Sequence, residues 1–150
     1  MALTRPPLSL KGRALRYLSA REHSRAELER KLTPHVQEGD NLQSLLDDLE
    51  TKGFINEARV VESVLHQKAG RMGAIRLRQE LRTKGVDDTA IQEALTQLQN
   101  STSGSEQERA QSLWQRRFGS APSNPRERLR QMRFLAARGF AADTIRRVVP

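Results

Sequence analysis

The chain has 150 residues, 36% of them hydrophobic, which is enough for one domain or a short array of small repeats. It has no cysteine, which excludes disulfides and thiolate chemistry, and it carries a net charge of +8. No apolar run is long enough for a signal peptide or a membrane span, so we expect a soluble cytoplasmic protein without a membrane partner.

The chain shows helical spacing of its apolar residues throughout, and no segment alternates like a strand. Helix starts are marked by the capping residues Ser24, Ser105 and Asn124, the last of which is followed by a proline. The pattern predicts nine helices, in chain order at about 8–21, 24–33, 40–52, 56–69, 72–84, 87–99, 106–118, 125–138 and 141–149.

Similar segments recur along the chain. "RLRQELRTKGV" (76–86) resembles "RLRQMRFLAARGF" (128–140), and matching Leu28, Leu77 and Leu129 gives steps of 49 and 52 residues. We therefore predict an all-α protein in which three tandem three-helix repeats form an elongated, curved helical array. The predicted parts of this continuous repeat domain are a flexible N-terminus at 1–9 and repeats at 10–53, 54–100 and 101–150.

A basic residue, a glycine and an apolar residue follow each other at three predicted helix ends. The glycines are Gly53, Gly85 and Gly139. A glycine just past a helix adopts the left-handed conformation without a Cβ penalty. The apolar residue after it is expected to pack back on the last turn; these residues are Phe54, Val86 and Phe140.

Enzyme chemistry finds little support in the sequence. The three histidines have no metal-ligand spacing, and His23, just before a helix cap, is expected in a solvated turn. The neighbouring carboxylates Asp47, Asp48 and Glu50 lie off the apolar face of their helix, which favours a solvated face over an acid–base pair. We expect a non-catalytic protein with no metal and no cofactor.

The positive charge is concentrated in the last third of the chain. Residues 101–150 carry ten arginines, no lysine and four acidic residues, a net charge of +6, whereas residues 1–53 and 54–100 each carry +1. The planar guanidinium suits phosphate and carboxylate groups. The excess indicates an anionic partner, either nucleic acid or an acidic protein surface; the alternative is an idle, solvated arginine-rich surface.

Two groups of arginines are candidates for this contact. In the second repeat they are Arg71, Arg78 and Arg82, whereas Arg76 is expected to pair with Glu80 one turn later. In the third repeat Arg126, Arg130 and Arg133 form one stripe, although like charges one turn apart cost a few tenths of a kcal/mol per pair. Further arginines are expected to extend that basic region; they include Arg109, Arg116 and Arg117.

Three segments together resemble the bacterial RecX regulatory proteins: "LSAREHSRAELERKL" (18–32), "KGFINEARVVESVLHQKAGRMGAIRLRQELRTKGV" (52–86) and "RQMRFLAARGF" (130–140). Their order and spacing match the family over about residues 10–149. One departure is that Arg59 is followed by two valines where the family commonly has an aromatic residue.

The resemblance implies three tandem three-helix units and a regulator without catalytic residues. It implies binding to the RecA recombinase, as filament or monomer, and restraint of its strand exchange, ATP hydrolysis and coprotease activities, hence a role in recombination, DNA repair and the SOS response. We expect a monomer whose DNA contacts, if any, are weak, non-specific and made to phosphate. The alternative is a DNA-binding regulator in which one unit acts as a helix-turn-helix.

Overall fold

The structure, a computed structural model, describes residues 7–101 and 104–150. Within these ranges the chain forms only helices, so the all-α prediction is confirmed. The α-helices are α1 (Leu10–Ala20), α2 (Arg25–Leu32), α3 (Leu42–Thr51), α4 (Glu57–Lys68), α5 (Ala74–Thr83), α6 (Asp88–Gln99), α7 (Glu106–Arg117), α8 (Pro125–Ala137) and α9 (Ala142–Val148). Two 3₁₀ turns complete them, η1 (Thr33–His35) and η2 (Ala69–Arg71).

The predicted caps are in place. The hydroxyl of Ser24 accepts from the backbone N–H of Glu27, whose carboxylate accepts from the backbone N–H of Ser24, which makes a full capping box. The side chains of Ser105 and Asn124 likewise accept from the backbone N–H of the third residue of α7 and of α8, Glu108 and Glu127. Local side-chain chemistry thus begins three of the helices where the sequence predicted them.

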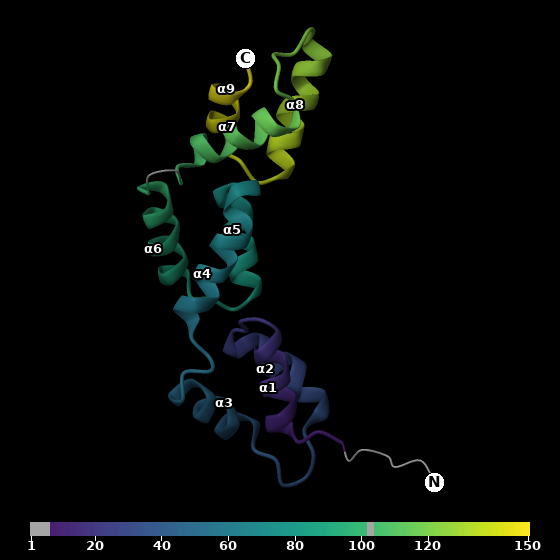
Figure 1. Ribbon diagram of the computed structural model, residues 1–150, viewed down its shortest axis with the longest axis vertical. Helices are drawn as coiled ribbons and strands as arrows, with labels where there is room; N and C mark the ends of the chain where they lie inside the picture. The colour runs from purple at the N-terminus through teal and green to yellow at the C-terminus, as the bar shows by residue number, and fades with distance from the viewer. Residues whose placement is uncertain (1–6, 102–103) are drawn as a thin grey trace, which may run out of the picture. The chain divides into compact units, whose positions relative to one another are not determined.

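The chain divides into two compact units, residues 1–60 and 61–150. In the first, α2 packs against both α1 and α3, in the purple and blue part of Figure 1. Its core consists of Leu10, Ala14, Leu28, Leu32, Leu46, Leu49 and Ile55. All of these residues except Ile55, which follows α3, lie on the apolar stripes of three short helices, none of which could bury its apolar face alone.

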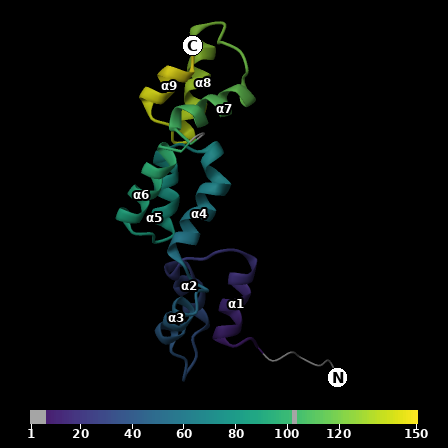
Figure 2. The same cartoon turned by 60° about the vertical axis from the view of Figure 1, so that its left-hand side comes forward.

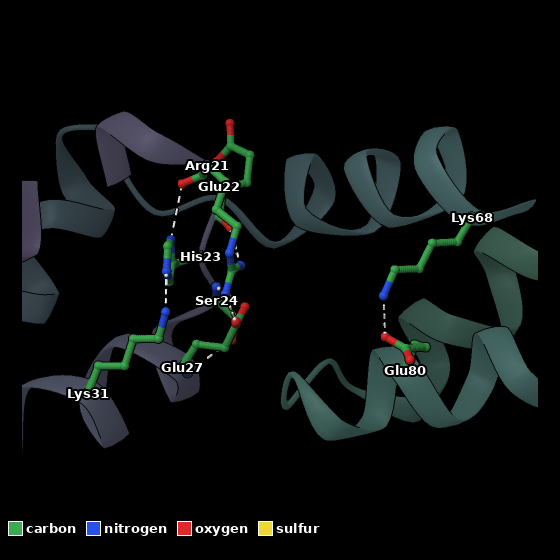
Figure 3. Close-up of polar contacts among 8 residues, drawn as sticks. All are labelled: Arg21, Glu22, His23, Ser24, Glu27, Lys31, Lys68 and Glu80. Carbon is green, nitrogen blue, oxygen red and sulfur yellow. Dashed lines mark hydrogen bonds and ion pairs between the residues drawn. The ribbon is translucent and has the colours of Figure 1, made fainter. Parts of the chain in front are cut away.

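His23 corrects one prediction, because it is buried and does not lie in a solvated turn. Its Nδ1 lies 3.1 Å from the carbonyl oxygen of Arg21, and its Nε2 lies 2.9 Å from Nζ of Lys31 (Figure 3). A proton on Nδ1 leaves Nε2 as the acceptor for the lysine. Burial lowers the pKa of His23, and the neighbouring Arg21 and Lys31 charges act in the same direction.

The second unit holds two groups of helices, which Figures 1 and 2 show in teal and in green to yellow. In the first group α5 and α6 lie side by side in both views and pack together. In the second, α7, α8 and α9 pack on one another. The core of the second group consists of Ala110, Leu113, Trp114, Leu135, Phe140, Ile145, Val148 and Val149.

The start of α5 and the end of α8 are joined by backbone hydrogen bonds. The N–H of Gly73 donates to the carbonyl of Arg138 at 2.8 Å, and the N–H of Ile75 donates to the carbonyl of Gly139 at 3.3 Å. Free N–H groups at one helix start thus satisfy free carbonyls at another helix end. A Cβ on Gly73 would collide with the backbone of Gly139, so this approach requires glycine.

Glu106, in the first turn of α7, strengthens the same junction. Its Oε1 accepts from the N–H of Ala74 at 3.0 Å, and its Oε2 accepts from Oγ1 of Thr144 at 2.9 Å. One carboxylate therefore caps α5 and holds α9.

Leu129, which the sequence match pairs with Leu28 and Leu77, differs from both in its burial. Leu28 and Leu77 are fully buried, whereas Leu129 is 51% exposed. Counted back from the glycine that ends each helix, the residue equivalent to Leu77 is Gln131, which is buried and accepts from Nε1 of Trp114 at 2.9 Å. The repeat match is therefore wrong by two residues in α8.

The three glycine junctions share their backbone but not their packing. Gly53, Gly85 and Gly139 all have φ between 81° and 86°, as predicted. Val86 and Phe140 are buried behind two of them, but Phe54 is 46% exposed, and the next residue, Ile55, is buried in its place. The prediction that Phe54 packs back is therefore wrong.

No helix among residues 7–101 and 104–150 is long and apolar enough to cross a membrane.

The predicted boundaries of the three repeats and their predicted curved arrangement stay predictions.

Candidate functional site

The arginines of the second repeat are largely engaged within it. Nη2 of Arg78 donates to Oε1 of Gln92 at 3.1 Å, and Nε of Arg82 lies 3.0 Å from Oδ1 of Asp88; both partners are on α6. The pair of Arg82 and Asp88 is well exposed, so it contributes only about 0–1 kcal/mol to stability. Arg71, in η2, is exposed and has no side-chain partner in the part of the chain that the structure describes.

Glu80 does not pair with Arg76, contrary to the sequence prediction. Nζ of Lys68, at the end of α4, lies 2.6 Å from Oε2 of Glu80 (Figure 3), and both side chains are mostly buried. The hydrogen bond from Lys68 lowers the pKa of the Glu80 carboxyl. Arg76 donates to the carbonyl of Ala137 at 3.3 Å, so it belongs to the junction of α5 and α8.

The predicted stripe on α8 is exposed along its whole length. Arg130 lies 3.4 Å from Glu127, one turn earlier, and its side chain is 64% exposed. Arg126 and Arg133 have no side-chain partner among the described residues. In this respect the third-repeat arginines differ from Arg78 and Arg82.

Two of the predicted site residues meet over an aromatic pair. Phe118 and Phe134 pack edge to face with their ring centroids 5.4 Å apart. The guanidinium of Arg117 lies 5.4 Å from the Phe118 centroid, and that of Arg130 lies 5.7 Å from the same centroid. These are cation–π distances, so the rings hold both guanidinium groups in place at the surface.

Arg138 joins this cluster, and sequence reasoning missed it. Its guanidinium lies 4.9 Å from the centroid of Phe134, closer than Arg117 at 5.6 Å. The signal was the spacing of four residues between Phe134 and Arg138, which places them on neighbouring turns of one helix face. From the sequence, Arg138 was predicted only to be the basic residue that precedes Gly139 at a helix end.

Two arginines assigned to the basic region link α7 to the turn η2. Arg116 is exposed, and its Nη2 donates to the carbonyl of Gly70 at 3.0 Å. Arg109 is only 6% exposed and donates to the carbonyls of Ala69 at 2.8 Å and Met72 at 3.2 Å. Burial lowers the pKa of Arg109. The expectation that Arg109 extends the basic surface is therefore wrong, because backbone carbonyls take up its donors.

Sequence models of three consecutive RecX domains match the chain. The first three-helix domain matches residues 11–35, the second 56–95 and the third 105–149. A relative from Leptothrix cholodnii named "Regulatory protein RecX" is 52% identical over 99% of this chain and 92% of its own length. A protein of the same name from Ralstonia nicotianae is 50% identical, over 99% and 91% of the two chains.

Solved structures show the same fold. A crystal structure of RecX from Lactobacillus salivarius superposes with a TM-score of 0.72, covering 93% of this chain and 91% of that one at 24% identity. A second RecX crystal structure gives a TM-score of 0.74, also at 24% identity, and covers 93% of this chain and 70% of that one.

Proposed function

The chain belongs to the RecX family of regulatory proteins, and on this premise we propose that it binds the RecA recombinase and restrains its activities. The observation that carries the proposal is the match of three consecutive domains, in order, together with relatives of about half-identical sequence that are named as regulators. The chain would act without catalysis, by binding RecA or the RecA–DNA filament. It would do so in the cytoplasm, during recombination, DNA repair and the SOS response.

The exposed arginines fit a contact with such a filament. Arg71, Arg126 and Arg133 are exposed and have no side-chain partner among the described residues. A RecA–DNA filament presents phosphates and carboxylates, and either could satisfy them. Binding to bare DNA would be weaker, independent of sequence, and would fall steeply with salt because each phosphate contact releases counterions.

The proposal is tested with the purified full-length protein and the RecA of the same genome. We expect single-strand-dependent ATP hydrolysis and strand exchange to fall as the protein is added up to a stoichiometric ratio. A wild-type protein that changes neither rate contradicts the proposal. Protection of specific bases in one duplex sequence would favour the helix-turn-helix alternative.

A matched pair of charge reversals locates the contact. Arg126/Arg130/Arg133→Glu changes the stripe of α8, whereas Arg71/Arg78/Arg82→Glu changes the second-repeat set, of which two arginines already have partners on α6. We expect the α8 triple variant to lose at least about tenfold in RecA inhibition, because like-charge contacts cost several kcal/mol at an interface. We expect a smaller loss from the second-repeat triple. Equal inhibition by both variants and the wild type would show that neither set contacts the filament.

A further inference from the structure

We propose that the outward face of α8 is a protein-docking surface, in which Leu129 is an apolar anchor that enters an acidic-rimmed pocket of the partner. The outward face of α8 is defined as Arg126, Leu129, Arg130 and Arg133. This inference rests on the proposed function, since it names the chemistry of the surface that the partner must offer.

The outward face of α8 points away from the core of its own domain. At roughly 100° per residue, the spacings of three, four and seven residues put Leu129, Arg130 and Arg133 on the same side as Arg126. The buried residues of α8, Gln131 and Leu135, follow Arg126 by five and nine residues and so lie on the opposite side. Leu129 is accordingly not among the residues that form the core of α7, α8 and α9.

Leu129 lies in the middle of this face with 51% of its surface exposed. Leu129 lies outside the core, whereas Gln131 and Leu135 are the buried residues of α8. Burying the exposed half on a partner would contribute about 25 cal/mol per Å² of apolar surface. The stripe is therefore not purely basic, and its centre is apolar.

The charges around Leu129 have few acids to balance them. Within the face only Arg130 has a carboxylate nearby, Glu127 at 3.4 Å, while Arg126 and Arg133 have none among the described residues. The contact of Arg130 with the Phe118 ring also fixes that guanidinium before any partner arrives, which lowers the entropy lost on binding. An acidic surface satisfies all three arginines at once.

The apolar centre favours a protein over nucleic acid as the occupant. A sugar–phosphate backbone offers anions to the arginines but no pocket for an aliphatic side chain, and the face itself carries no aromatic residue on which a base could stack. Protein interfaces combine an apolar centre with a polar rim and are enriched in arginine. An amphipathic helix that enters a groove presents anchors at i, i+3, i+4 and i+7, the spacing of these four residues.

The test substitutes the anchor and leaves the charges in place. Leu129→Gln removes the apolar contact with a residue that helices accept, and Leu129→Met keeps it. The control is Ile75→Gln, which changes another exposed apolar residue, 53% exposed, on α5. Each full-length variant is titrated onto RecA filaments formed on oligo(dT), and separately onto bare oligo(dT), with thermal melting as the check on folding.

We expect Leu129→Gln to bind the filament at least about tenfold more weakly, while Leu129→Met and Ile75→Gln bind like the wild type. All variants should bind bare oligo(dT) equally and melt within a few degrees of the wild type. Wild-type filament binding by Leu129→Gln overturns the docking surface and leaves the proposed function standing. An equal loss on bare oligo(dT) overturns it in favour of a nucleic-acid contact. A wild-type protein that does not bind the filament overturns both.

Discussion

α5 and α8 are the second helices of adjacent domains and share the tetrapeptide "RLRQ", yet they use it in opposite ways. In α5 the leucine of this tetrapeptide, Leu77, is fully buried, whereas in α8 the leucine is Leu129, which faces solvent. The glycine that ends each helix explains the difference, because it lies eight residues after Leu77 but ten after Leu129. The helix end fixes the buried face, and the local motif does not.

When α5 and α8 are aligned on the glycines that end them, a second pair of equivalent positions differs, five residues before each glycine. There α5 has Glu80, bonded to Lys68 of α4, and α8 has Phe134, packed on Phe118 just after α7. Both contacts join the second helix of a domain to the first helix or its end. One domain does this with an ion pair and the other with two aromatic rings, over which the guanidinium groups of Arg117, Arg130 and Arg138 lie.

The largest expected losses of stability come from exchanging the residues at the equivalent buried positions, Leu77 in α5 and Gln131 in α8. Leu77→Gln places an amide at a fully buried position, and we expect the free energy of unfolding to fall by about 3 kcal/mol or more. Gln131→Leu leaves Nε1–H of Trp114 without its acceptor, at a cost of about 1–3 kcal/mol. Urea unfolding measures both, and Trp114, the single tryptophan, reports on the second directly.

Leu129→Gln is the control for this pair, because it makes the same change on the exposed side of α8. We expect its unfolding free energy to stay within about 0.5 kcal/mol of the wild type. A loss as large as that of Leu77→Gln would mean that Leu129 is buried after all and that the glycine does not set the register.

Helix positions were predictable because their signals are local. Capping by Ser24, Ser105 and Asn124, and the left-handed glycines, depend on residues within one turn. The burial of single residues was not predictable, since it depends on the neighbouring helix. Phe54 follows its glycine as Phe140 does, but Ile55 is buried in its place. His23 was predicted to lie in a solvated turn, but it contacts the backbone of Arg21 and the side chain of Lys31.

The candidate site was predictable in its charge but not in its partners. The sequence identified the α8 stripe from spacing alone, and all three arginines are exposed. It could not foresee that Arg109 donates to carbonyls of η2 some forty residues earlier in the chain, because that contact exists only once two domains have packed. Leu129 differs in burial from Leu77, with which the sequence match pairs it, because the glycine that ends α8 lies two residues farther from its leucine than the glycine that ends α5.

Substitutions of the helix-ending glycines Gly53 and Gly139 are expected to lower stability by a smaller amount. Both have positive φ, so alanine at either costs about 1–2 kcal/mol in backbone strain. A Cβ at position 53 meets nothing within 4 Å, whereas at position 139 it would collide with the backbone of Arg76. We expect Gly139→Ala to lower the melting temperature clearly more than Gly53→Ala does. Equal shifts, measured by calorimetry, would mean that α5 does not approach the end of α8 closely.

The stability contributed by the ion pair should depend on pH, whereas that contributed by the aromatic pair should not. This is the smallest of the expected effects. Hydrogen bonding from Lys68 holds the pKa of Glu80 below its ordinary value of 4.5, so the folded protein binds fewer protons than the unfolded chain there. The contribution of Glu80 is therefore fully present above pH 4.5 and is lost as the pH falls through the folded value. Glu80→Gln should cost up to about 1 kcal/mol in unfolding free energy at pH 7 and less at pH 3.

Phe134→Leu gives the matched measurement in α8, because neither phenylalanine of the aromatic pair titrates. Its cost in unfolding free energy should be the same at pH 7 and at pH 3, provided that the protein is folded at both. Urea unfolding of the wild type and both variants at the two pH values tests this directly. A Glu80→Gln cost as large at pH 3 as at pH 7 would show that the side chain stabilises α5 by packing and not by its charge, and the contrast between the two domains would then lie in shape alone.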